Sequence, residues 1–89
     1  SRGGHAYYET EEFIVALSGS FDIVLNDGKE SKIYSLNRSY YGLHVPKMTW
    51  REMTNFSTNS VALVLSSTKY NERDYIRDFD EFLEKKGLL

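Results

Sequence analysis

The side chains best suited to chemistry are concentrated near the start of the chain, in residues 2–19 (RGGHAYYETEEFIVALSG). His5 and Tyr7 are two residues apart, and side chains at this spacing in an extended strand point to the same face. An imidazole titrates near neutral pH and suits a general base, whereas a phenol titrates near about 10 and is better suited to act as an acid. The pattern predicts a short strand that carries site chemistry, followed by a bend and a buried strand.

Glu12 and Gly19 complete a pattern similar to the first motif of the cupin barrels. That motif is His-x-His followed by a Glu and then a Gly, and His5, Tyr7, Glu12 and Gly19 fit its spacing. The difference is Tyr7, which stands where the motif has its second His. The strand that carries His5 and Tyr7 is therefore expected to form part of a barrel.

A later stretch has the spacing of the second cupin motif. Pro46 and Asn55 stand at the separation of its Pro and Asn, whereas Met48 and Arg51 replace its Gly and its His. The two stretches occur in the expected order and on predicted strands. Together they favour a cupin barrel.

The ligand set for a cupin metal is incomplete. Cupins bind a metal with three His and one Glu, and here only His5 and Glu12 remain. Tyr7 is a poor ligand, and Arg51 is a permanent cation that would repel a metal ion. We predict no metal site, which leaves two interpretations of His5: a hydrogen-bonded interior histidine, or a residue of an active site.

Short apolar stretches that position these residues recur along the chain at a spacing of about ten residues. Strands are expected over 13–17, 21–25, 32–36, 40–45, 50–55 and 60–66, the first of them fully buried. Asn26-Asp27-Gly28 is expected to supply the positive φ angles of a tight hairpin turn. About six or seven short strands indicate an all-β barrel or sandwich.

The end of the chain has a helical pattern instead. One apolar stripe at helical spacing contains Tyr75, Ile76, Phe79, Phe82 and Leu83. Asn71 or Asp74 would cap the start of this helix, and Gly87 stands where it would end. The stripe must pack on the barrel or on a second copy of the chain.

Composition narrows the class of protein. The chain has 89 residues, of which 40% are hydrophobic and 15% aromatic, so we expect one folded domain over residues 1–89. A net charge of −2 without a basic face argues against a nucleic-acid partner. The sequence contains no cysteine, which excludes disulfides and permits a cytoplasmic location. No apolar stretch is long enough to predict a membrane-spanning helix.

Three stretches resemble the dTDP-4-oxo-6-deoxyglucose 3,4-ketoisomerases, the WxcM-like sugar-nucleotide cupins. They are RGGHAYYETEEFIVALSGSFDIVLNDGK, YGLHVPKMTWREM and VLSSTKYNERDYIRDFDEF, and they cover nearly all of the chain. The resemblance implies an all-β cupin jelly-roll barrel with one C-terminal helix, lacking the family's N-terminal strands. It also implies a bacterial, cytoplasmic homodimer in deoxysugar biosynthesis for lipopolysaccharide or S-layer glycans. The implied reaction moves a keto group between neighbouring carbons of a dTDP-sugar, without a metal or another cofactor.

The resemblance also implies roles for individual residues. His5 and Tyr7 match the family's His-Ala-His, which makes His5 the expected base and Tyr7 the expected acid. Arg2 and Arg77 match arginines expected to contact phosphate, although the helical pattern puts Arg77 on a solvated face. The other candidate substrate-binding residues are Glu12, Tyr41, Trp50 and Arg51. Aromatic side chains in that set would stack on thymine or line a sugar pocket, unless they pack in the core.

Two alternatives to a separate isomerase remain open. Replacement of the second His by Tyr7 could leave a module that binds a nucleotide-sugar without catalysis. The domain could also be the isomerase part of a bifunctional protein with an acyltransferase.

Overall fold

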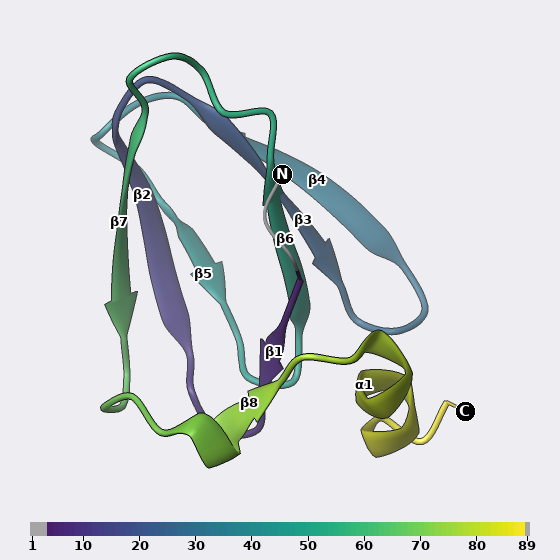
Figure 1. Cartoon of the computed structure of the whole chain (residues 1–89). Helices are drawn as coiled ribbons and strands as arrows, with labels where there is room; N and C mark the ends of the chain where they lie inside the picture. Colours follow the sequence, from purple (N-terminus) through teal and green to yellow (C-terminus); the bar gives the residue numbers. More distant parts are fainter. Residues whose placement is uncertain (1–3, 89) are drawn as a thin grey trace.

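The computed structural model describes residues 4–88, whose strands form two three-stranded sheets and one two-stranded sheet. One sheet has the order β5-β2-β7 (Leu43–Val45, Glu12–Ser18, Val61–Ser66), and the other has the order β4-β3-β6 (Ser31–Leu36, Phe21–Asn26, Trp50–Thr54). These two sheets face each other, and the pair β1 (Ala6–Tyr7) and β8 (Tyr75–Ile76) lies at one end of them (Figure 1). The prediction of an all-β architecture with one C-terminal helix, α1 (Phe79–Lys85), is confirmed.

The β3–β4 hairpin forms where the sequence predicts it. All six residues of β3 pair with the six of β4, from Phe21 opposite Leu36 to Asn26 opposite Ser31. Within the turn, the Asn26 side chain accepts a hydrogen bond of 2.7 Å from the Gly28 amide. Of residues 26–28, Gly28 alone takes a positive φ, 100°, in a region that favours glycine.

The strand predicted to be fully buried is buried along one face and only in part along the other. Ile14 and Ala16 of β2 are each 1% exposed, whereas Phe13 and Leu17 are 41% and 49% exposed. The inner face packs against the second sheet, while on the outer face only Val15, between the two exposed residues, is buried, at 9% exposure. β7 is exposed along its whole length because it is an edge strand, paired with β2 alone among the described residues.

The strand predicted over 40–45 is shorter than expected. β5 begins at Leu43 and ends at Val45, immediately before Pro46. Before Leu43 the chain leaves the sheet, because β2 pairs with β5 only as far as Ile14 opposite Leu43. The preceding segment turns away, and it includes Tyr40 and Tyr41.

The predicted helix from residue 74 is wrong in its first half. Glu72–Asp74 form a 3₁₀ turn, Tyr75–Ile76 form β8, and α1 begins only at Phe79. Asp78, rather than Asn71 or Asp74, caps the helix, since its side chain accepts a hydrogen bond from the Asp80 amide. The end of the helix is as predicted, with Gly87 just beyond it at a φ of 78°.

Long-range contacts explain this difference. The Asp74 carboxylate accepts hydrogen bonds from the backbone amides of Glu9 (2.8 Å) and Thr10 (3.1 Å), so it is engaged with the β1–β2 connection. The backbone of Tyr75–Ile76 pairs with β1. Sheet pairing and tertiary hydrogen bonds therefore replace the first turns of the predicted helix.

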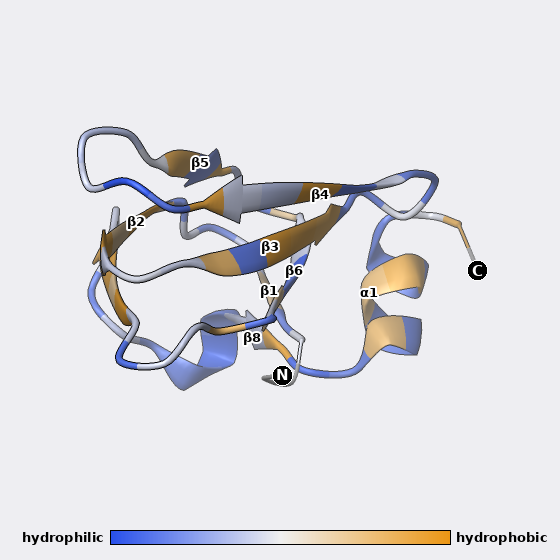
Figure 2. Cartoon of the chain, turned by 90° about the horizontal axis from the view of Figure 1, so that it is seen from above, coloured by the Kyte–Doolittle hydropathy of each residue, from blue (hydrophilic) through white to orange (hydrophobic). Residues whose placement is uncertain are grey.

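Two groups of buried apolar side chains hold the elements together. The first lies between the sheets and contains Ile14, Ala16, Phe21, Ile23, Leu36 and Val45. The second attaches α1 to β1, β6 and β8, and contains Ala6, Trp50, Ile76 and Phe82. Figure 2 shows the corresponding hydrophobic stretches on β2, β3 and α1. None of the helices in the described part of the chain is long and apolar enough to cross a membrane.

Candidate active site

Backbone pairing brings the start of the chain to the middle of the fold. The His5 amide donates to the Arg51 carbonyl (3.1 Å), and the Arg51 amide donates to the His5 carbonyl (2.9 Å). On its other side β1 pairs with β8, so that Tyr7 lies opposite Tyr75. β1 is thus placed between β6 and β8, and its side chains lie next to those of both strands.

The rings of His5 and Tyr7 are in contact. Their centroids are 5.1 Å apart and the ring planes are nearly perpendicular, at 89°. The ring of Tyr75 completes a triangle, with centroids 5.5 Å from His5 and 4.8 Å from Tyr7. The imidazole and the phenol are therefore close enough to serve adjacent atoms of one small substrate.

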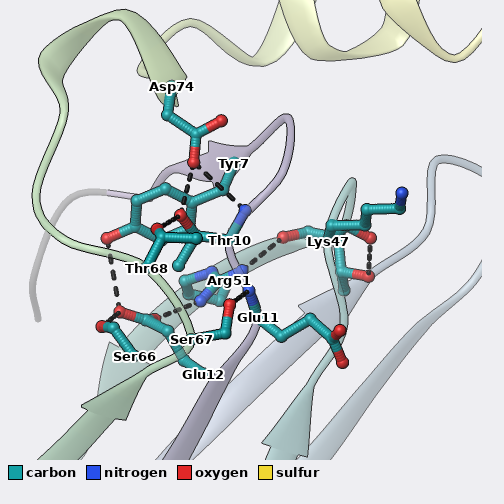
Figure 3. A network of polar contacts seen from close by, with 11 residues as sticks. Tyr7, Thr10, Glu11, Glu12, Lys47, Arg51, Ser66, Ser67, Thr68 and Asp74 are labelled. Atoms are coloured by element: carbon teal, nitrogen blue, oxygen red, sulfur yellow. Dashed lines mark hydrogen bonds and ion pairs between the residues drawn. The ribbon is translucent and has the colours of Figure 1, made fainter.

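A buried ion pair lies below the ring of Tyr7 (Figure 3). Arg51 Nη1 donates a short hydrogen bond to Glu12 Oε1, and the two residues are 2% and 7% exposed. The Tyr7 hydroxyl and Ser66 Oγ both donate to Glu12 Oε2, each at 3.3 Å. Arg51 Nη2 donates to the Thr49 carbonyl at 3.1 Å. Glu12 is thus a shared acceptor that orients the phenol, and Arg51 balances its charge.

The surroundings set the protonation of both candidate catalytic residues. Burial, and then the charge of Arg51, lower the pKa of His5, so the imidazole is neutral and able to accept a proton at neutral pH. Burial, the Tyr75 side chain and the Glu12 carboxylate raise the pKa of Tyr7. The phenol therefore keeps its proton and is a donor. Burial also lowers the pKa of Arg51, while Glu12 opposes that shift.

A small pocket opens beside the network. It has a volume of about 140 Å³ and is lined by Tyr7, Thr10, Glu12, Ser66, Thr68, Lys69, Tyr70, Asn71 and Tyr75. On its rim the Thr10 hydroxyl contacts Thr68 Oγ1 and donates to Asp74, both at 2.5 Å (Figure 3). These contacts tie the β1–β2 connection to the segment before β8, so both sides of the pocket are held in place.

The aromatic candidates Trp50 and Tyr41 lie apart from His5 and Tyr7. Trp50 is 7% exposed and packs against Phe79 and Phe82 of α1, with ring centroids 5.2 and 5.8 Å away. Tyr41 is 41% exposed, and its hydroxyl donates to the Asn37 side chain. Trp50 joins a helix to the sheet, and Tyr41 lies in the connection between β4 and β5.

Arg77 lies nearer to the candidate site than the helical pattern predicts. It follows β8 directly, and its guanidinium lies 4.7 Å from the centroid of the Tyr75 ring. It also forms an exposed ion pair with Glu72 (3.1 Å), and its charge contributes to the lowered pKa of His5. Arg2 lies outside the described residues.

Two residues of this arrangement were not predicted. Ser66 was interpreted only as the end of an apolar strand, and Tyr75 as part of a helical stripe. Tyr75 was missed because its spacing to Phe79 and Phe82 fits a helix, and the pairing with β1 that places it beside His5 leaves no local signal. Among residues 4–88, no cluster of three His, Asp or Glu side chains is arranged to hold a metal ion.

Comparisons with known proteins agree over nearly the whole chain. The family model FdtA (WxcM-like, C-terminal) matches residues 1–87. A curated relative from Aneurinibacillus thermoaerophilus, TDP-4-oxo-6-deoxy-alpha-D-glucose-3,4-oxoisomerase, is 39% identical over 94 residues, covering 97% of this chain and 68% of the relative.

Solved structures also match over nearly the whole chain. A 3,4-ketoisomerase from Helicobacter canadensis has a TM-score of 0.94 at 50% identity, covering 97% of this chain and 65% of that one. WlaRA, a TDP-fucose-3,4-ketoisomerase from Campylobacter jejuni, has a TM-score of 0.92 at 42% identity, covering 96% and 63%. QdtA from Thermoanaerobacterium thermosaccharolyticum, a sugar 3,4-ketoisomerase in complex with TDP, has a TM-score of 0.93 at 37% identity, covering 97% and 63%. The chain therefore spans slightly less than two thirds of the length of these solved relatives.

Proposed function

The chain belongs to the FdtA family (WxcM-like, C-terminal) and has the predicted cupin fold, and we propose that it is a sugar-nucleotide 3,4-ketoisomerase. The proposed substrate is a dTDP-4-oxo-6-deoxyhexose, in line with the activity named for its relative at 39% identity. The observation that carries the proposal is the contact between His5, held neutral, and Tyr7, held protonated. Such a pair is what a keto–enediol tautomerisation requires.

In the proposed reaction, one proton moves between carbons and one between oxygens. His5 removes the proton from C3 of the sugar, while Tyr7 gives its phenolic proton to the C4 oxygen, and an enediol forms. His5 then returns a proton to C4, and Tyr7 recovers one from the C3 hydroxyl as the C3 carbonyl forms. Both residues finish as they began, and the step is redox-neutral, so no metal or other cofactor enters the proposal.

Glu12 and Arg51 have a supporting role in this scheme. The Glu12 carboxylate accepts the hydrogen bond of the Tyr7 hydroxyl and so directs the phenol before substrate arrives. Arg51 keeps that carboxylate paired in a buried position, where an unpaired charge would be costly. Both residues remain proposed members of the substrate site.

Phosphate recognition is assigned to arginines. Arg77 is exposed beside Tyr75, where a guanidinium is available to a pyrophosphate oxygen. Arg2 is proposed for the same task on the resemblance of its motif. Tyr41 and Trp50 remain candidates for contact with the base or the sugar, and the packing of Trp50 on α1 favours a structural role for that residue.

The direct test follows the sugar by NMR in deuterated water. Incubation of dTDP-4-oxo-6-deoxyglucose with the protein should give the 3-oxo isomer, with deuterium incorporated at the exchanging carbon. His5→Asn should abolish both, because within residues 4–88 the only other imidazole, His44, is paired with Glu11. Full activity in the His5→Asn variant would remove His5 as the base.

A binding module without catalysis is the second candidate, favoured by the tyrosine at position 7. It predicts that the protein binds dTDP in calorimetry but exchanges no sugar proton. A bifunctional protein with an acyltransferase is also consistent with the family, and the length of the gene would decide between this protein and a separate isomerase.

A homodimer and a cytoplasmic location belong to the same proposal. The absence of cysteine permits the cytoplasmic location.

A further inference from the structure

Among the described residues, Tyr75 is the one whose ring contacts both proposed catalytic residues. Its centroid lies 4.8 Å from that of Tyr7 and 5.5 Å from that of His5. Two further side chains pack against it, since the Tyr70 ring is 5.4 Å away and the Arg77 guanidinium 4.7 Å away. Tyr75 is half-buried and also lines the pocket.

The position of Tyr75 depends on backbone pairing rather than on a mobile loop. It lies directly opposite Tyr7 in the β1–β8 pair, and the Tyr8 amide donates to the Asp74 carbonyl at 3.1 Å. Directly opposed side chains on one face of an antiparallel pair are close neighbours and restrict each other's rotamers. The Tyr75 ring is therefore held where it limits the movement of the Tyr7 ring.

We infer that Tyr75 is a positioning residue of the site. Its ring fixes the relative orientation of the His5 and Tyr7 rings and keeps water away from the imidazole. The packing role depends on the geometry alone, whereas its consequence for turnover rests on the proposed isomerase function.

The charges around His5 determine what removal of the ring would do. Arg51 on β6 and Arg77 after β8 lower the pKa of His5, and Glu12 on β2 raises it, while burial makes the largest contribution and lowers it. Tyr7 on its own strand is protonated and neutral. If the Tyr75 ring is lost, water reaches the imidazole and the burial contribution shrinks, so the pKa of His5 should rise.

The experiment titrates His5 by NMR in the parent, Tyr75→Phe and Tyr75→Leu. Tyr75→Phe keeps the ring and should leave the pKa of His5 unchanged. Tyr75→Leu should raise it by about 0.5–1 unit, the scale expected when a partly buried group gains solvent. His44, the second histidine, is exposed and bonded to Glu11 at 2.6 Å, so its signal is an internal reference that should not move.

Kinetics provide the second measurement. In Tyr75→Leu we expect kcat to fall about tenfold or more while KM changes less than about threefold, because the general acid and base lose alignment. The acid limb of the kcat/KM profile, which reports deprotonation of His5, should move to higher pH. Tyr75→Phe keeps the ring but loses the hydroxyl that interacts with the Tyr7 side chain, so its kcat should lie between those of the parent and Tyr75→Leu, while the acid limb should stay at the pH of the parent.

Controls keep the result unambiguous. Tyr34→Leu removes a tyrosine from β4, which is separated by β3 from the β6 strand that His5 joins, and it should change neither the titration nor the kinetics. If Tyr75→Leu does not fold, as judged by its thermal transition, Tyr75→Ile replaces it, because isoleucine is favoured in strands.

An unchanged His5 titration in a folded variant that lacks the ring would overturn the inference. If the parent shows no isomerase activity but the titration shifts as expected, the proposed function fails and the positioning role of Tyr75 stands.

Discussion

Tyr7 is the residue on which the proposed chemistry depends. Its hydroxyl donates to Glu12, its ring contacts His5 and Tyr75, and Arg51 lies 4.9 Å from its ring centroid. Burial and these neighbours raise its pKa, so the phenolate is not available as a base at neutral pH. The phenol therefore fits an acid that hands over a proton already directed by a hydrogen bond.

The first prediction separates the two proton transfers. Tyr7→Phe keeps the ring and removes the acid, so isomerisation should slow by about 10²–10⁴-fold. Deuterium exchange at C3, which depends on His5, should remain partly intact. NMR of the sugar measures both rates in one sample.

The informative comparison is Tyr7→His. If the parent is an active isomerase, Tyr7→His should change the exchange rate only modestly. If the parent is a binding module, Tyr7→His should create exchange that the parent lacks. Loss of exchange and isomerisation to the same extent in Tyr7→Phe would contradict separate roles for the two residues.

The second prediction concerns the buried ion pair. Arg51→Met should lower the free energy of unfolding by about 3–5 kcal/mol, because it leaves the Glu12 carboxylate buried without its cation. Glu12→Gln should cost a comparable amount, since it leaves Arg51 buried without its anion and its single amide oxygen replaces only one of the two oxygens that accept from Arg51 and Tyr7. Urea denaturation measures both.

The double variant is the control for this pair. Glu12→Leu with Arg51→Met removes both charges, and it should be more stable than Arg51→Met alone. A loss below about 1 kcal/mol in Arg51→Met would show that the pair contributes as little as a surface salt bridge.

At the scale of elements, α1 depends on a few aromatic contacts for its place. Phe82 is the buried residue of the helix, at 0% exposure, and it packs against Trp50 and Phe79. Gly4 allows the approach of Trp50 to β1, since a Cβ at that position would lie 2.4 Å from the indole nitrogen. The helix is thus attached at the back of the strand that carries His5 and Tyr7.

The third prediction tests this attachment. Phe82→Ala should lower the free energy of unfolding by about 3–5 kcal/mol, because it removes a large buried ring and leaves a cavity. Glu84→Ala, on the exposed side of the same helix, should change it by less than about 0.5 kcal/mol. Equal thermal transitions for the two variants would mean that α1 is not part of the cooperative unit.

At the scale of the whole molecule, one sheet face is unusually apolar and open. In β2 and β7, Phe13 lies directly opposite Leu65, and the residues are 41% and 54% exposed. Leu17 and Leu63 extend the same exposed surface, at 49% and 38%. β7 also has a free edge among the described residues. An exposed apolar face next to an open strand edge is typical of an interface.

The fourth prediction is a homodimer that covers this face. Light scattering at micromolar concentration should give twice the 10.3 kDa mass of the chain. Leu65→Lys should shift the protein toward the monomer, because a charge would be buried in the interface. Lys29→Glu, in the β3–β4 turn, changes charge far from this face and should leave the mass unchanged. A parent that remains at 10.3 kDa would contradict the prediction.

Local signals in the sequence determined most of the strands and predicted that His5 and Tyr7 lie together. Alternation and apolar runs locate β2, β3, β4, β6 and β7, and the Asn-Asp-Gly turn locates a hairpin, because these patterns act over only a few residues. The spacing of His5 and Tyr7 similarly predicts that they serve one site.

Tertiary structure alone decided the secondary structure of residues 74–83, the burial of β2 and the neighbours of His5. Residues 74–83 satisfy a helical stripe, yet Asp74 binds the amides of Glu9 and Thr10, and the next two residues pair with β1. Those partners are more than 60 residues away in sequence, with separations of 65 and 64 for the two hydrogen bonds, so no local pattern reports them. The exposure of Phe13 has the same origin, because burial depends on which layer of the fold a strand face meets. Tyr75 lies at the site because the antiparallel pairing of β8 with β1 places it opposite Tyr7. This pairing is the physical reason that Tyr75 is in a strand rather than in a helix.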